Sequence, residues 1–212
     1  RQIWAANEGR GYYGEAISPD GRYGLYYHED AIYLHELATG QTRQVSEPVG
    51  KGELLGDMMI SPDGRQIVYV RRMPDWSTNL CFRNIDGSGA RRLALNKGVR
   101  ARLWSWSPDG RSLLASLSQM DGEKRVSSGV LLAVADGSTR VLPWNPTGGR
   151  FSPDGRHVVF VKAVQQLANR GGDLMLASLD GGPERAGWKA LAPTASLYGR
   201  RPATGCCLSA TA

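Results

Sequence analysis

Cysteine is scarce in this sequence, with only three among 212 residues. So few cysteines do not make a disulfide framework, and no His or Cys neighbours give them metal-ligand spacing. Cys206 and Cys207 are adjacent, which places them poorly to bridge each other. Cys81 lies in an apolar segment, so we expect it to be a buried small hydrophobic residue. The cysteines therefore give no evidence about the redox compartment.

Long apolar runs are also missing, and none approaches the length that a membrane-spanning helix requires. The chain does not begin with Met, and no basic-then-apolar signal peptide opens it. We therefore expect an excised or processed piece of a longer protein, without a direct membrane span in this piece.

Patterns typical of catalysis are absent as well. The Gly-x-Ser-x-Gly pentapeptide of α/β-hydrolases does not occur. The histidines are His28, His35 and His157, and none has an acid and a nucleophile beside it. No Gly-rich phosphate loop precedes a helix, and calcium-loop spacing is missing. We therefore predict that the chain is not an enzyme and binds neither cofactor nor metal.

Basic residues are in slight excess, and they are spread through the repeats instead of gathered in one part. The net charge is +6, from 26 basic and 20 acidic residues. Nucleic-acid binding needs basic residues gathered on one face, whereas the basic residues here are spread through turns, and four arginines end the repeated turns. We interpret them as solvated surface and predict no nucleic-acid partner, with a phosphate-binding surface as the alternative.

The sequence does contain a repeated pentapeptide, Ser-Pro-Asp-Gly-Arg. It occurs at residues 18–22, 61–65, 107–111 and 152–156, at intervals of 43, 46 and 45 residues. Such a period indicates repeated supersecondary units. Ser, Pro, Asp and Gly suit the successive positions of a type I turn, and Gly accepts positive φ. In the alternative interpretation a ring of acids binds metal, formed by Asp20, Asp63, Asp109 and Asp154.

Short segments rich in β-branched or aromatic residues follow each pentapeptide, which favours strands. They are residues 23–27, 66–70, 112–116 and 157–161. Their apolar residues run on without clean alternation, which indicates burial on both faces. A strand before each pentapeptide, a second apolar strand after it and a further short segment complete each unit. Four strands per unit is the number in a β-propeller blade.

The repeat divides the chain into units at about residues 11–46, 56–95, 100–143 and 148–185. We assign residues 1–188 to propeller blades, with residues 2–4 as an outer strand of a last blade. Within the units, we expect residues 119–128 to be a polar excursion and residues 163–168 to form one helical turn. Residues 189–212 are expected to be either a degenerate start of a fifth blade or a disordered tail.

Four in-phase copies of Ser-Pro-Asp-Gly-Arg, each followed by an apolar strand, resemble the WD-like propeller repeats of the TolB family. Similar repeats occur in tricorn-like and prolyl oligopeptidase-like peptidases and in bacterial envelope proteins. The resemblance covers about residues 11–185 and implies an all-β fold, a β-propeller of four-stranded antiparallel blades with four clear blades. It also implies a place in a six-bladed or larger ring, and a periplasmic or cell-envelope location.

In a propeller, the loops before the first strand and between the second and third strands share one face. Aromatic and arginine residues are the usual anchors of interfaces. The candidate partner contacts on this face are Tyr12, Tyr13, Trp76, Arg100, Arg102, Trp144 and Asn145. Trp104 and Trp106 precede a turn on the same strand face, so we expect them to pack between blades.

Two classes of function follow from these features. The first is a non-catalytic binding or scaffolding propeller that engages a protein or peptide on one face. The second is the accessory, substrate-filtering propeller of a serine peptidase whose catalytic domain lies outside this chain. The missing hydrolase pentapeptide favours the first for the chain itself. Open blade edges are further expected to allow self-association.

Overall fold

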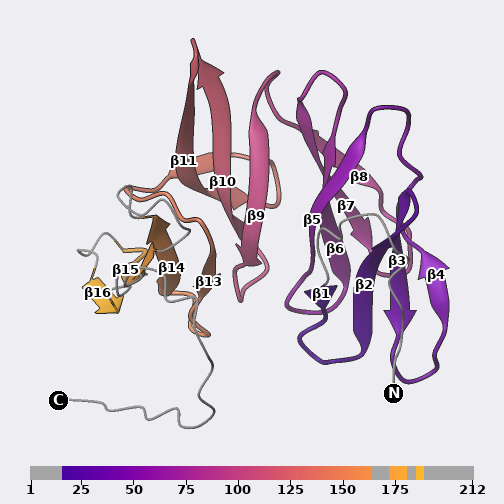
Figure 1. Cartoon of the computed structure of the whole chain (residues 1–212). Coiled ribbons are helices and arrows are strands. Elements are labelled where there is room, and N and C mark those ends of the chain that lie inside the picture. Colours follow the sequence, from indigo (N-terminus) through magenta and orange to yellow (C-terminus); the bar gives the residue numbers. More distant parts are fainter. Residues whose placement is uncertain (1–15, 164–171, 181–184, 189–212) are drawn as a thin grey trace, which may run out of the picture.

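The computed structural model describes residues 16–163, 172–180 and 185–188, which form four sheets that we call blades 1 to 4 (Figure 1). Blade 1 contains β1 (Ala16–Ile17), β2 (Tyr23–His28), β3 (Ala31–Glu36) and β4 (Thr42–Gln44). Blade 2 contains β5 (Leu54–Ile60), β6 (Gln66–Arg72), β7 (Thr78–Asn84) and β8 (Arg91–Ala94). Blade 3 contains β9 (Arg100–Trp106), β10 (Ser112–Asp121), β11 (Lys124–Ala133) and β12 (Thr139–Val141). Blade 4 contains β13 (Gly149–Phe151), β14 (His157–Ala163), β15 (Gly172–Ser178) and β16 (Arg185–Trp188).

Each blade is an antiparallel sheet whose strands lie in chain order. The first strands of the blades are neighbours, with β1 beside β5, β5 beside β9, and β9 beside β13. This is the arrangement of successive β-propeller blades, so the predicted all-β propeller of four-stranded blades is confirmed. The strand expected at residues 2–4 and the end segment 189–212 lie outside the described residues, as does nearly all of the helical turn expected at 163–168.

The repeated pentapeptide forms the turn between the first two strands of each blade. In the first copy, the Gly21 N–H donates to the Ser18 carbonyl at 2.8 Å, and Gly21 has a φ of 69°. Asp20 Oδ1 accepts the Ser18 hydroxyl at 2.6 Å and the Arg22 N–H at 3.0 Å. The other three copies repeat this hydrogen-bond pattern. The turn prediction is therefore confirmed, and each aspartate is bonded within its own turn.

Within the described part of the chain, the hydrophobic core forms three clusters, one at each junction between neighbouring blades. Strand β6 shows why its sequence does not alternate. Ile67 and Tyr69 pack toward blade 1, whereas Val68 and Val70 pack toward blade 3. All four are at most 2% exposed. A strand buried on both faces is apolar at successive positions, as the sequence predicts.

An arginine on the fourth strand of blades 1, 2 and 3 makes the same kind of contact. We call these residues the outer-strand arginines: Arg43, Arg91 and Arg140. Each of them donates to a carbonyl just after the third strand of the next blade. The acceptors are the carbonyls of Ile85, of Val134 and Ala135, and of Leu179. The same type of hydrogen bond therefore joins the outer parts of all three described junctions.

The segment 119–128 is the polar excursion that the sequence predicts, and it is formed by the paired ends of two strands. Strands β10 and β11 stay paired to Asp121 and Lys124, and Gly122 takes a φ of 61° in the turn between them. This part of the hairpin is largely exposed and includes Met120 and Val126. The sequence does not reveal that this excursion is strand, because a ribbon without a core face needs no apolar pattern.

Candidate binding site

The hairpin loop between β6 and β7 holds Trp76 in an unusual backbone conformation. The Trp76 N–H donates to the Met73 carbonyl at 2.9 Å, which makes Pro74 and Asp75 the centre of a β-turn. Asp75 Oδ1 accepts the N–H and the hydroxyl of Ser77, at 3.0 and 2.6 Å. Trp76 has a φ of 65°, in the left-handed region. The loop therefore has the geometry of the Pro-Asp-Gly turns, with Trp in the position of glycine.

Trp76 remains on the surface, where it pairs with Arg100. The residue is 51% exposed, and the Arg100 guanidinium carbon lies 4.3 Å from the centroid of its ring. A cation at this distance is attracted to the electron-rich face of the indole. Arg100 is the first residue of β9, so the contact joins a loop of blade 2 to the first strand of blade 3.

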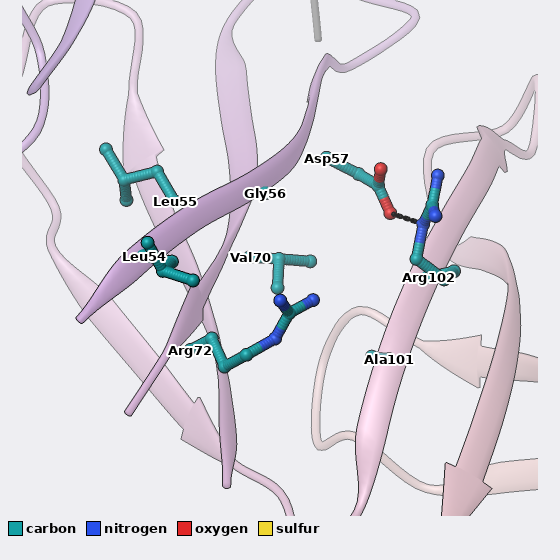
Figure 2. Close-up of a pocket in the computed structure, with 8 residues that line it drawn as sticks. All are labelled: Leu54, Leu55, Gly56, Asp57, Val70, Arg72, Ala101 and Arg102. Carbon is teal, nitrogen blue, oxygen red and sulfur yellow. Dashed lines mark hydrogen bonds and ion pairs between the residues drawn. The ribbon is translucent and has the colours of Figure 1, made fainter. Parts of the chain in front are cut away.

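Strand β5 contains a β-bulge near this contact. The pairing of β5 with β6 shifts between Leu55 and Met58, so that Gly56 and Asp57 together oppose Val70. A Cβ on Gly56 would lie 3.3 Å from the Val70 side chain, which makes glycine well suited to this close approach. Bulges bend a strand and change the direction of its side chains. Here the bulge carries Asp57 to where its carboxylate faces β9 (Figure 2).

The Asp57 carboxylate links blades 2 and 3. Its Oδ2 accepts hydrogen bonds from Arg102 Nε and from the Leu103 N–H, both at 2.9 Å. The side chains of Asp57 and Arg102 are 21% and 57% exposed, so water screens their ion pair only in part. The Arg102 guanidinium carbon also lies 5.2 Å from the centroid of the Trp104 ring. These contacts hold Arg102 near the gap between β5 and β9.

A pocket of about 270 Å³ occupies that gap (Figure 2). Its charged side chains are Arg72, Arg102 and Asp57, and Figure 2 shows Arg72 extending from β6 toward β9. The remaining lining residues are Leu54, Leu55, Gly56, Val70 and Ala101. The pocket therefore combines an apolar wall with two guanidinium groups and one carboxylate.

The neighbouring Arg71 belongs to a different environment. Its side chain is 9% exposed, and its NH2 lies 2.5 Å from Glu53 Oε2. The Gly50 backbone N–H and Arg71 hold the pKa of Glu53 below its usual value. Glu47 adds a weaker ion pair to Arg71 at 3.5 Å. Arg71 thus serves the packing of blades 1 and 2, whereas Arg72 lines the pocket between blades 2 and 3.

The structure brings three of the predicted contact residues together. Trp76 stacks with Arg100, and Arg102 follows two residues later on β9. Tyr12 and Tyr13 lie outside the described residues. Sequence reasoning missed Asp57 and Arg72, although a Gly-Asp pair inside an apolar strand is a signal for a bulge.

The prediction that Trp144 contacts a partner needs correction. Trp144 is only 6% exposed, because its ring stacks on Phe160 with centroids 4.2 Å apart. It belongs to the core between blades 3 and 4. Asn145 is exposed, and its Oδ1 lies 3.0 Å from the Ser116 hydroxyl. Both residues therefore lie at the next junction rather than at the pocket.

Trp106 and Trp104 lie on β9 as structural residues. Trp106 is 8% exposed and meets Phe82 edge to face, so its predicted packing between blades is confirmed. Its indole N–H donates to the Gly110 carbonyl at 2.8 Å. Trp104 is half-buried against the core between blades 3 and 4, and its indole N–H donates to Ser116 Oγ at 2.9 Å.

The ionisable residues with catalytic or metal-binding potential stay apart from one another. His35 Nδ1 lies 2.8 Å from Thr42 Oγ1, and His28 Nε2 lies 3.9 Å from Glu29 Oε1. In the described part of the chain, no three His, Cys, Asp or Glu side chains are placed to hold a metal ion. Cys81 is buried as predicted, and burial raises the pKa of its thiol. Among the described residues, no helix has the length and apolar character needed to cross a membrane.

The fold defines this protein as a β-propeller, and curated relatives with similar sequences are peptidases. No protein-family model matches the sequence. Dipeptidyl-peptidase 5 of Porphyromonas endodontalis is 31% identical over 129 residues, covering 57% of this chain and 18% of that protein. Tricorn protease homolog 1 of Streptomyces coelicolor is 26% identical over 145 residues, covering 68% of this chain and 13% of that protein. The chain thus spans less than a fifth of the length of these relatives.

Solved structures with a similar fold are also longer than this chain. TolB from Acinetobacter baumannii has a TM-score of 0.63 at 18% identity, covering 86% of this chain and 45% of that one. The propeller domain of the Trilobed protease from Pyrococcus furiosus has a TM-score of 0.57 at 13% identity, covering 82% of this chain and 57% of that one. At such identities the likeness establishes the propeller fold alone.

Proposed function

We propose that this chain is a non-catalytic, TolB-like propeller module that binds a protein or peptide in the bacterial cell envelope. The observation that carries the proposal is the exposed, strained Trp76 with Arg100 stacked on it beside the pocket between blades 2 and 3. The envelope location rests on the resemblance of the repeats to those of TolB.

The strain at Trp76 supports a role beyond folding. A non-glycine residue whose backbone is in the left-handed region is about 1–2 kcal/mol less stable than glycine there. An exposed cation–π contact stabilises by about 0.5–1 kcal/mol. The local balance therefore does not favour Trp at this position. Strained residues cluster at ligand-binding sites, and Trp and Arg are enriched among residues that dominate interface energies.

The alternative function is an accessory propeller that filters substrates for a serine peptidase. The peptidase relatives favour this alternative, because the chain aligns with only a small part of each. Both functions require a peptide-binding face, and they differ in what lies outside the chain. Finding a domain with Gly-x-Ser-x-Gly in the same gene would favour the peptidase accessory; a signal peptide or membrane anchor without such a domain would favour the envelope module.

Peptide selection with matched variants tests the binding face. Peptides selected from a displayed library on this chain should lose affinity at least about tenfold with Trp76→Ala, because an aromatic anchor is removed. Arg65→Ala is the control, since Arg65 is an exposed residue in the turn at the opposite end of blade 2. Loss with both variants, or with neither, would contradict the proposed face.

A further inference from the structure

In the described part of the chain, the paired ends of β10 and β11 extend beyond the strands on either side of them. The pairing between β10 and β11 continues without a shift as far as Asp121 and Lys124. On one side, the pairing of β9 with β10 ends at Ser118, and on the other, β12 pairs with β11 only from Val130 onward. This two-stranded ribbon therefore projects past β9 (Figure 1), and β11 has an open edge at residues 124–128.

The direction of the backbone groups on β11 identifies which of them face this open edge. The Gly129 carbonyl accepts a hydrogen bond from the Leu142 N–H at 2.8 Å, so the backbone of Gly129 faces the side of β12. The backbone groups of successive residues face opposite sides of a strand, and the register with β10 contains no bulge that would change this alternation. Arg125 and Ser127 therefore direct their N–H and C=O groups outward, whereas Val126 directs its own toward β10.

The open edge lacks the features that usually prevent strand pairing. Proteins commonly protect such edges with proline, with a bulge or with a covering segment. Residues 125–128 are Arg-Val-Ser-Ser, without proline, and they pair with β10 without a bulge. Arg125, Val126 and Ser127 are all exposed in the described part of the chain. An extended segment can add to such an edge as a further strand, with main-chain hydrogen bonds supplying the affinity.

The side chains along the edge favour an acidic segment. Lys124 lies directly opposite Asp121 in the ribbon, whereas Arg125 lies opposite the uncharged Met120. Arg125 takes part in none of the ion pairs formed by the described residues. Opposite charges directly across a strand pair attract each other, and β-branched residues pair favourably in the same way. Because Val126 is 47% exposed, the edge fits a strand in which acidic and β-branched residues alternate.

We propose that the open edge of β11 binds an extended acidic segment of a partner protein. The segment pairs as a further strand with the backbone of Arg125 and Ser127, and it places a carboxylate opposite the Arg125 side chain. This surface is separate from the contact between Trp76 and Arg100, because β10 lies between β9 and β11. The inference goes beyond the proposed function and does not depend on it.

Two labelled peptides test the proposal by fluorescence polarisation. One is an eight-residue peptide with blocked ends in which Glu alternates with Val, and the other has Lys in place of each Glu. We expect the Glu peptide to bind at least about threefold more tightly, the scale expected when a repulsive cross-strand charge pair is replaced by an attractive one. Arg125→Glu leaves the backbone unchanged and should reverse this preference.

Hydrogen exchange measured by NMR locates the added strand. Saturating Glu peptide should slow exchange of the Arg125 and Ser127 N–H groups at least about tenfold, because these groups gain hydrogen-bond partners. The Val126 and Ser128 N–H groups already face β10, so their exchange should change less.

A matched pair of proline variants tests the edge itself. Ser127→Pro removes an outward N–H from β11, and proline is tolerated where a strand N–H faces solvent. Met120→Pro is the control: Met120 lies directly opposite Arg125, so its N–H faces outward from the other edge of the same ribbon. We expect Ser127→Pro to weaken binding of the Glu peptide at least about tenfold and Met120→Pro to change it less than about twofold.

The other outcomes count against the proposal in distinguishable ways. Equal binding of the Glu and Lys peptides, with no effect of Arg125→Glu, would exclude an acidic ligand. Protection of the Arg125 and Ser127 N–H groups that rises with protein concentration, without peptide, would overturn the proposal in favour of a second copy of this chain. Binding that Trp76→Ala abolishes and Ser127→Pro leaves intact would assign the peptide to the Trp76 face. Failure of both peptides, in a protein that still binds peptides through Trp76, would refute this inference and leave the proposed function standing.

Discussion

At the residue scale, Trp76 occupies a turn position that is glycine in the repeated turns. The repeated turns place Gly at the left-handed residue, with φ between 68° and 73°. The loop at Pro74 and Asp75 keeps the same hydrogen bond and places Trp there. Glycine meets no steric penalty in this region. Trp76, which we propose contacts the partner, therefore has a backbone conformation that destabilises the loop relative to glycine.

This cost can be measured by comparing Trp76→Gly with Trp76→Ala. Both variants lose the ring and its contact with Arg100, but only glycine relieves the backbone. We expect the Gly variant to have a free energy of unfolding about 1–2 kcal/mol above that of the Ala variant, measured by urea denaturation. Equal stability would mean that the loop relaxes when the ring is removed, and that no strain is held there.

The repeated turns give a second test at the residue scale. Gly64 has a φ of 68°, so Gly64→Val would force a β-branched side chain into the left-handed region, at a cost of about 1–3 kcal/mol. Asp63→Asn should be mild, because an amide oxygen can accept the same bonds from Ser61 and Arg65. Thermal unfolding of both variants would show the difference. Equal damage would point to a role for the aspartate charge.

The turn aspartates also predict how stability depends on pH. The Ser18 hydroxyl and the Arg22 backbone N–H lower the pKa of Asp20 to about 2. In the other copies, the Ser hydroxyl and the following backbone N–H also lower the aspartate pKa. A depressed pKa stabilises the folded state above the unfolded pKa, and this contribution is lost as pH falls through the folded value. We expect stability to decline from about pH 4 toward pH 2, less steeply in Asp63→Asn; an unchanged acid profile in that variant would contradict this.

At the element scale, the outer-strand arginines connect neighbouring blades, because each donates from one blade to a backbone carbonyl of the next. Arg91 donates to the carbonyls of Val134 and Ala135, and its guanidinium carbon lies 4.3 Å from the Phe82 ring centroid. The side chain of the adjacent Arg92 is 53% exposed, and it forms a long ion pair of 3.9 Å with Glu47. Two neighbouring arginines on one short strand therefore have different structural roles.

A pair of matched substitutions tests this difference. Arg91→Met should destabilise the protein by about 1–2 kcal/mol, because two carbonyls lose a charged donor. Arg92→Met should cost no more than about 0.5 kcal/mol, because exposed ion pairs contribute little. Both variants remove one positive charge, so urea unfolding compares them directly. A larger loss for Arg92 would contradict the junction role of Arg91.

Features that depend on neighbouring residues can be predicted from this sequence, whereas contacts between residues far apart in the chain cannot. Turns depend on four or five consecutive residues, so Ser-Pro-Asp-Gly-Arg was sufficient to predict them. The Asp57–Arg102 contact joins residues 45 apart and depends on a bulge and on how two blades are spaced. The burial of Trp144 depends on Phe160 in the following blade. Contacts between blades therefore require the structure, even when each blade is evident in the sequence.

At the scale of the whole molecule, blade 4 differs from blades 2 and 3 in having large apolar side chains partly exposed on one face, as far as the described residues show. Val158 and Phe160 pack toward blade 3 and are at most 1% exposed. On the opposite face, apolar residues form two directly paired positions across β14 and β15: Val159 with Leu176, and Val161 with Leu174. Their exposures lie between 37% and 43%. Apolar patches left open on a sheet mark an association surface or an aggregation liability.

We therefore expect this chain to self-associate through the Val159–Leu176 and Val161–Leu174 face unless another blade covers it. Sedimentation should show a mass that rises with protein concentration. Leu174→Lys should shift the distribution toward monomer, because a charge in the patch must be desolvated when the face is covered. Met120→Lys is the control, since Met120 is 58% exposed at the tip of the β10–β11 hairpin. A stable monomer at all concentrations, with both chain ends resistant to limited proteolysis, would mean instead that this face is covered within a closed ring.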